Sequence, residues 1–163
     1  MLTCLTLVAT GAMMVVAAQA GKAAGGDPDA AEVYNYHLTM DKIQKAAAAT
    51  DAINKYLAAN PAVKSQMDGE DNSGKTIDQQ AKILDTKYPQ AAAIIKSNGL
   101  TTREDILVTR VFITGVMFVG MKKQGAIKDY PPNSLSPQNA AFLEQNFDKL
   151  QGLAGKMMPP QAR

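Results

Sequence analysis

The chain has 163 residues, of which 46% are hydrophobic and 20% are charged, so its length supports one folded domain. Its 17 basic and 15 acidic residues leave a formal net charge of +2, which is too small an excess to indicate a nucleic-acid-binding protein. One Cys and one His leave few groups for a metal site or a catalytic nucleophile.

Residues 1–20 have the features of an export signal. They are mostly apolar, contain no charged side chain and end in the small-x-small triplet Ala18-Gln19-Ala20, which signal peptidase recognises. We therefore expect an exported protein, periplasmic or envelope-associated, from which residues 1–20, and with them Cys4, are removed. An uncleaved membrane anchor is the main alternative, because about 20 apolar residues span a bilayer. Only in that case do we expect contact with a membrane.

A helical domain is expected over residues 36–156, after a flexible segment at residues 21–35. Thr39 predicts the start of the first helix, because a threonine hydroxyl accepts a hydrogen bond from a backbone N–H that the first helical turn leaves free. Apolar residues then recur at spacings of three and four as far as Asn60, after which Pro61 can begin a short new turn. Residues 64–75 are polar and contain glycine, which predicts a loop.

Two shorter helices are expected next. Thr76 and Gln79 form a capping-box pattern, which predicts a helix through Lys87. Pro89 favours the start of another short helix over residues 90–97, which Asn98 and Gly99 close because they tolerate the left-handed conformation.

The most apolar helix is expected over about residues 102–124, after a second capping-box pattern that ends at Glu104. Apolar residues fall on all its sides, which predicts a buried central helix. Gly125 ends it, Ser136 starts a last helix, and residues 157–163 are expected to be frayed. The sequence therefore predicts an all-α, single-domain bundle of about five helices.

Three stretches carry a resemblance to known proteins. They are Tyr36-His37-Leu38-Thr39-Met40, Gly99-Leu100-Thr101-Thr102-Arg103-Glu104 and Asn139-Ala140-Ala141-Phe142. The chain resembles a family of small exported bacterial proteins that share an aromatic-x-Leu-Thr-Met start, a Gly-Leu-Thr-x-Arg-Glu junction and an Asn-x-x-Phe last helix. No activity is assigned to that family, so the resemblance implies an exported helical fold and nothing catalytic.

His37 and Met40 are candidate cofactor ligands, because imidazole and thioether groups suit haem iron and copper. The alternative is a surface histidine beside a helix start, with Tyr36 as a neighbouring contact residue. We expect no cofactor, and keep a haem- or copper-binding protein as the alternative function.

Met117 and Met121 lie one helical turn apart in the predicted central helix. They are expected in the core, or in contact with an apolar ligand or a partner protein. Gly115 and Gly120 would allow a neighbouring helix or a ligand to approach the same helix closely.

Arg110 is a charged residue inside this apolar helix, and a buried guanidinium needs acceptors. A carboxylate partner is the favoured interpretation. Alternatives are an anionic ligand held in a pocket, or a side chain that reaches the rim of the domain. The expected partners are Asp41, Asp51 or Asp85.

The acidic loop at residues 68–74 resembles a calcium loop only in part. Ser73 stands where glycine is needed and Gln79 where glutamate is needed, so we expect no high-affinity calcium site. Sequence motifs of hydrolases, nucleotide-binding enzymes and zinc proteases are absent. We therefore expect a non-enzymatic module that binds an unknown partner protein or apolar small molecule, or has a structural role.

Overall fold

The computed structural model describes residues 27–157, which form a single domain of seven helices with no strand among them. The helices are α1 (Ala30–Asn35), α2 (Met40–Ala59), α3 (Pro61–Asp68), α4 (Ile77–Lys87), α5 (Pro89–Ser97), α6 (Thr102–Lys123) and α7 (Pro137–Met157). The predicted all-α single domain is confirmed, with two more helices than expected. The predicted export signal and residues 158–163 lie outside the described residues.

The predicted capping residues begin the helices at the expected positions. The Thr39 hydroxyl accepts a hydrogen bond from the Lys42 N–H at 3.3 Å, at the start of α2. At the start of α4, both hydrogen bonds of the Thr76–Gln79 capping box form. Local hydrogen bonding thus marks where these helices start.

The two helices that the sequence analysis misses are α1 and α3, neither of which contains a buried residue. The predicted loop over residues 64–75 is wrong as far as Asp68, because Pro61 begins a helix whose composition is polar. The predicted flexible segment is wrong from Ala30 to Asn35, which form α1. Hydrophobic periodicity cannot detect a helix that buries no side chain.

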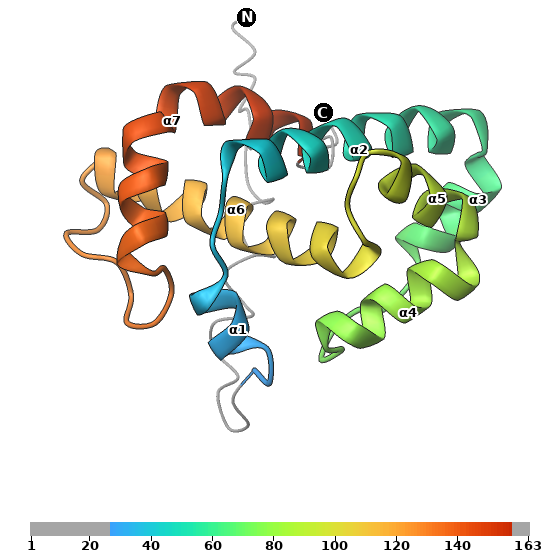
Figure 1. The fold of residues 1–163 in the computed structure, drawn as a ribbon, viewed down its shortest axis with the longest axis horizontal. Coiled ribbons are helices and arrows are strands. Elements are labelled where there is room, and N and C mark those ends of the chain that lie inside the picture. The colour runs from blue at the N-terminus through green and yellow to red at the C-terminus, as the bar shows by residue number, and fades with distance from the viewer. Residues whose placement is uncertain (1–26, 158–163) are drawn as a thin grey trace, which may run out of the picture.

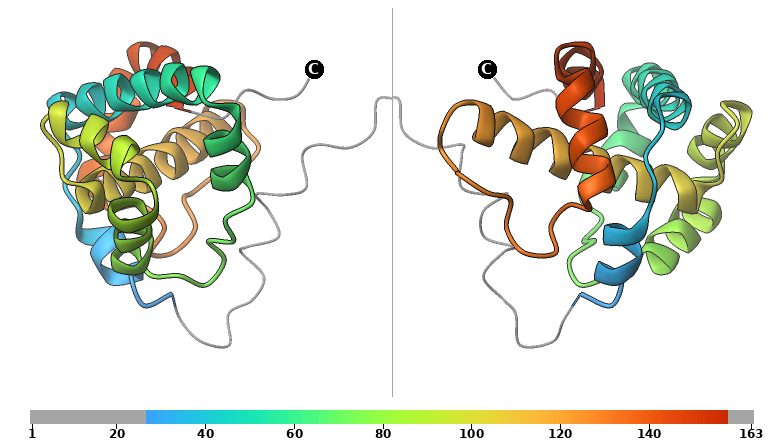
Figure 2. Two further views of the ribbon diagram at one scale, coloured as in Figure 1. Left: turned by 90° about the vertical axis from the view of Figure 1, so that its right-hand side faces the viewer. Right: turned by 60° about the vertical axis from the view of Figure 1, so that its left-hand side comes forward.

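Helix α6 is the central helix: it runs across the middle of the molecule and packs against α1, α2, α4, α5 and α7 (Figure 1). In both views of Figure 2, α1 lies below α6, while α2 and the C-terminal part of α7 lie above it. The prediction that this helix is buried on all sides is wrong for one face, because Met117 is 36% exposed there. No helix in the described part of the chain is long and apolar enough to cross a membrane.

The ends of α7 depart in part from the expectations. The N–H of Asn139 donates to the Ser136 hydroxyl at 3.3 Å, as expected for a helix that starts there. At the other end, Met157 is the last residue of α7 and is buried, so its predicted fraying is wrong. Its side chain belongs to the hydrophobic core, which holds the last turn in place.

Asn139 joins the start of α7 to the link between α1 and α2. Its side-chain oxygen accepts the Leu38 N–H at 3.1 Å, and its amide nitrogen donates to the Tyr36 carbonyl at 2.7 Å. The side chain is almost fully buried, so water does not compete for these bonds. The chain between the first two helices is therefore held on α7.

Gly115 allows α6 and α7 to approach closely. A Cβ atom at this position would lie 2.4 Å from Cδ1 of Leu143 and 3.3 Å from Cδ1 of Leu135. Leu143 is completely buried, so it has little freedom to move aside. The expected close approach of a neighbouring helix is confirmed at this glycine.

We expect Gly115→Ala to lower the free energy of unfolding by about 1–2 kcal/mol, because the clash with Leu143 exceeds the gain in helix propensity. Gly152→Ala is the matched control: Gly152 lies inside α7, and a Cβ there meets nothing within 4 Å. The free energy of unfolding of this variant should exceed that of the wild type by about 0.5–1 kcal/mol. Chemical denaturation measures the free energy of unfolding of both variants. If Gly115→Ala were more stable than the wild type, a side chain at this position would not clash with Leu143.

Candidate functional site

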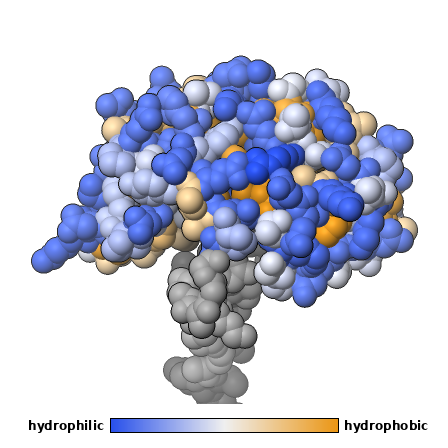
Figure 3. Space-filling model, turned by 60° about the horizontal axis from the view of Figure 1, so that its bottom comes forward, coloured by the Kyte–Doolittle hydropathy of each residue, from blue (hydrophilic) through white to orange (hydrophobic). Residues whose placement is uncertain are grey.

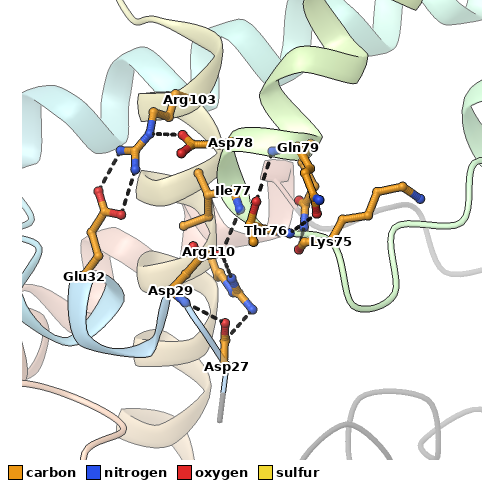
Figure 4. A network of polar contacts seen from close by, with 11 residues as sticks. Asp27, Asp29, Glu32, Lys75, Thr76, Ile77, Asp78, Gln79, Arg103 and Arg110 are labelled. Atoms are coloured by element: carbon orange, nitrogen blue, oxygen red, sulfur yellow. Dashed lines mark hydrogen bonds and ion pairs between the residues drawn. The ribbon is translucent and has the colours of Figure 1, made fainter. Parts of the chain in front are cut away.

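Arg103 in the first turn of α6 binds carboxylates from two other helices (Figure 4). Its two terminal nitrogens donate to Glu32 of α1 at 2.6 and 2.8 Å, and its Nε donates to Asp78 of α4 at 2.5 Å. The bidentate hydrogen bonds from Arg103 hold the pKa of Glu32 below its ordinary value. Arg103 thus connects α1, α4 and α6.

Arg110 lies about two turns further along α6 and binds the residues just before α1. Its Nη2 donates to Asp27 Oδ2 at 2.8 Å, and its Nη1 lies 3.5 Å from Asp29 Oδ2. The same Asp29 oxygen accepts the backbone N–H of Ile77 at 2.7 Å (Figure 4). Asp29 therefore satisfies an N–H group that the first turn of α4 leaves free.

The predicted partners of Arg110 are wrong. Asp41 pairs with Lys45 and Asp51 with Lys55, one helical turn away in each case, and Asp85 pairs with Lys96. The favoured interpretation, a carboxylate partner, is confirmed, but the partners are Asp27 and Asp29 of the N-terminal segment. The side chain of Arg110 is 37% exposed, so it also reaches the rim of the domain.

Tyr36 and Met40 are both half-buried, whereas His37 between them is exposed. The Tyr36 hydroxyl donates to Glu104 at 3.2 Å, and burial raises the pKa of this tyrosine. Glu104 also lies 3.1 Å from the Lys42 amine, which is 4.6 Å from the centre of the Tyr36 ring. These contacts connect α2 and α6, and nothing in them favours a haem or copper site.

Within residues 27–157, no three His, Cys, Asp or Glu side chains form a group that could hold a metal ion. In the acidic loop, Asp71 accepts hydrogen bonds from Ser73, and Glu70 lies 2.8 Å from the Lys87 amine. Glu70 also lines a hollow of about 90 Å³ with Tyr88. The acidic side chains of this loop are thus engaged by hydroxyl and ammonium groups of the chain itself.

Met117 and Met121 come together on the wall of an open groove between α6 and α7, with a volume of about 510 Å³. We call this surface the α6–α7 groove. Its lining is apolar apart from two glutamine side chains. The residues that line it are Val116, Met117, Gly120, Met121, Gln124, Phe147, Gln151, Ala154 and Gly155.

Lysine side chains lie beside the α6–α7 groove. The Lys123 amine is 5.0 Å from the centre of the Phe147 ring, one of the lining residues. Lys156, next to lining residue Gly155, is exposed. Lys122 is paired with Glu144 at 2.8 Å, so it adds little net charge. The groove is therefore apolar with ammonium groups close to it.

Asp105 in α6 is a buried carboxyl group that the sequence analysis does not single out. The residue is 9% exposed, and its Oδ1 atom has no hydrogen-bond partner among the described residues. Burial raises its pKa from 3.8 to about 7. An acidic residue in the first turn of a helix is expected for electrostatic reasons, so its position carries no signal of burial.

No family model, curated protein or solved structure matches the chain. The resemblance to small exported helical proteins therefore stays a prediction.

Asp105→Asn tests the buried carboxyl group. The folded state favours the protonated form, so the contribution of this group to stability is complete below pH 3.8 and is lost as the pH rises through about 7. At pH 8 the variant should be more stable than the wild type by up to about 4 kcal/mol, with the difference shrinking towards pH 4. Urea denaturation across this pH range measures the difference.

The control is Asp129→Asn, since Asp129 is exposed. This variant should follow the wild-type stability at every pH. If the difference between the wild type and Asp105→Asn were the same at pH 4 and pH 8, the carboxylate would not be destabilised by burial.

Proposed function

We propose that the protein is a non-enzymatic module that binds an amphipathic helix of a partner protein in the α6–α7 groove. The observation that carries the proposal is the exposure of Met117 on an open, apolar surface of a domain whose other large hydrophobic side chains, among the described residues, are buried or half-buried. An apolar groove on a folded domain favours the binding of a complementary apolar face.

The openness of the groove favours a helix over a small ligand. Sites for small molecules enclose most of the ligand surface, whereas this hollow lies open between two helices. A helix laid along it would bury one face and leave the other in water, as helix-in-groove complexes do. The partner helix would then present apolar residues at spacings of three and four.

The side chains of the groove support the same occupant. Met117 and Met121 are flexible and polarizable, so they adapt to different apolar surfaces. Gly120 of α6 and Gly155 of α7 have no side chains, so a partner helix can approach the backbone of both helices closely. Lys123 and Lys156 beside them favour acidic residues next to the apolar stripe of the partner.

The lining residues also support a non-enzymatic role. Gln124 and Gln151 are the polar side chains of the lining, and neither titrates in the physiological pH range. General acid–base catalysis needs a titratable group within hydrogen-bond reach of the reacting atoms. The groove can bind and orient an apolar surface, but its lining offers no side chain to transfer a proton.

A synthetic helical peptide with leucine on one face and glutamate on its flanks is the probe for this proposal. We expect it to bind the wild-type protein and to bind Met117→Glu about tenfold or more weakly, because the new carboxylate would be desolvated in an apolar contact. A peptide with lysine in place of glutamate should bind more weakly than the acidic one. Fluorescence anisotropy measures all three affinities.

The matched control is Met67→Glu, since Met67 is a half-buried methionine that lines the other hollow. This variant should bind the acidic peptide as the wild type does. Equal binding by Met117→Glu, or no binding by the wild type, would overturn the proposal. A wild-type dimer that dissociates in Met117→Glu would also overturn it, because a second copy of the chain would then occupy the groove. Binding of an apolar dye without binding of the peptide would overturn it too, because the groove would then be a small-molecule site.

We also propose that the protein is exported and acts in the periplasm or the cell envelope. The uncharged apolar stretch of residues 1–20, followed by the glycine-rich residues 21–26, supports this proposal. Intact-mass measurement on protein from its native envelope should give the mass of residues 21–163. The mass of the complete chain would indicate an uncleaved anchor instead.

A further inference from the structure

We propose that residues 27–35 form an electrostatic strap, which opens by itself as the ionic strength rises while the rest of the domain stays folded. The strap contains α1 and the two aspartates before it. It shares no residue with the α6–α7 groove, so the proposal is independent of the function assigned to that surface.

Charge rather than apolar burial holds the strap. No residue of α1 is buried; Glu32 of this helix binds Arg103, and Asp27 before the helix binds Arg110. The side chains of Arg103 and Glu32 are 42% and 40% exposed, so solvent ions reach this pair. Exposed ion pairs stabilise by about 0.2–1 kcal/mol each, and salt screens them.

The strap cannot keep its helical structure without these contacts. α1 has six residues, far fewer than an isolated helix needs in water. Besides the ion pairs, the strap is attached by the hydrogen bond between Asp29 and the Ile77 N–H and by the partly buried side chain of Val33, which packs against the core. Loss of the ion pairs should therefore both undock and unfold the strap.

Opening has a defined limit at the link to α2. Asn139 binds the backbone of Tyr36 and Leu38 through two buried hydrogen bonds, at 2.7 and 3.1 Å. These bonds involve no ionised group, so salt does not screen them. The chain from Tyr36 onward is thus held on α7 while the strap before it opens.

Opening would release Arg110 and one backbone group. Arg110 would lose both aspartates, Arg103 would keep only its contact with Asp78 of α4, and the Ile77 N–H would lose its acceptor. The side of the molecule on which α1 lies is mostly hydrophilic, with hydrophobic residues in small separate areas (Figure 3). Opening would expose the charged groups of the strap contacts together with the apolar surface that Val33 covers.

Two amide groups in the same helical turn allow a sharp test. The Ile77 N–H donates to Asp29 of the strap, whereas the Gln79 N–H donates to Thr76 of its own helix cap at 3.2 Å. Hydrogen exchange of both is measured by NMR on the full chain, from about 0.05 M to about 1 M NaCl. Exchange at Ile77 should become about tenfold faster, while exchange at Gln79 changes little.

Arg103→Gln should accelerate exchange at Ile77 already at low salt and reduce its salt dependence. Lys122→Gln is the control: it removes the ion pair with Glu144, which lies outside the strap contacts, and should leave Ile77 unchanged. The proposal is wrong if exchange at Ile77 does not respond to salt. It is also wrong if Ile77 and Gln79 accelerate together, since that would report opening of α4 rather than of the strap.

Discussion

The close contact between α6 and α7 at Gly115 determines how the rest of the domain packs. Leu143 occupies the space that a side chain at this position would take, and it is completely buried there. Because α7 also holds the α1–α2 link through Asn139, the contact at Gly115 fixes the position of that link relative to α6. The absence of a side chain at Gly115 therefore affects the positions of α6, α7 and the α1–α2 link.

The two halves of α6 have different roles. Its N-terminal half carries Arg103 and Arg110, which bind α1, the aspartates before it and α4 through ion pairs. Its C-terminal half carries Gly115, which packs against Leu143 of α7, and the two methionines, which line the α6–α7 groove. The proposed salt response involves the first half and the proposed partner binding the second, so the two proposals concern separate parts of one helix.

Helix boundaries were largely predictable because they depend on neighbouring residues. Thr39, Thr76 and Ser136 start their helices as expected, and Gly99 and Gly125 adopt the positive φ angles that helix ends favour. The second capping box is formed only in part: Thr101 accepts the Glu104 N–H, while the Glu104 carboxylate binds Lys42 instead. A tertiary contact has replaced the local one.

Local capping and helical spacing were enough to predict the all-helical class, most helix boundaries and the position of Met117 and Met121 on one helix face. The binding of Arg110 by Asp27 and Asp29, and the place of α7 as the second wall of the groove, could be seen only in the folded domain. Such contacts join residues far apart in the chain. Their partners depend on how α1 and α7 pack around α6, which no short stretch of sequence specifies.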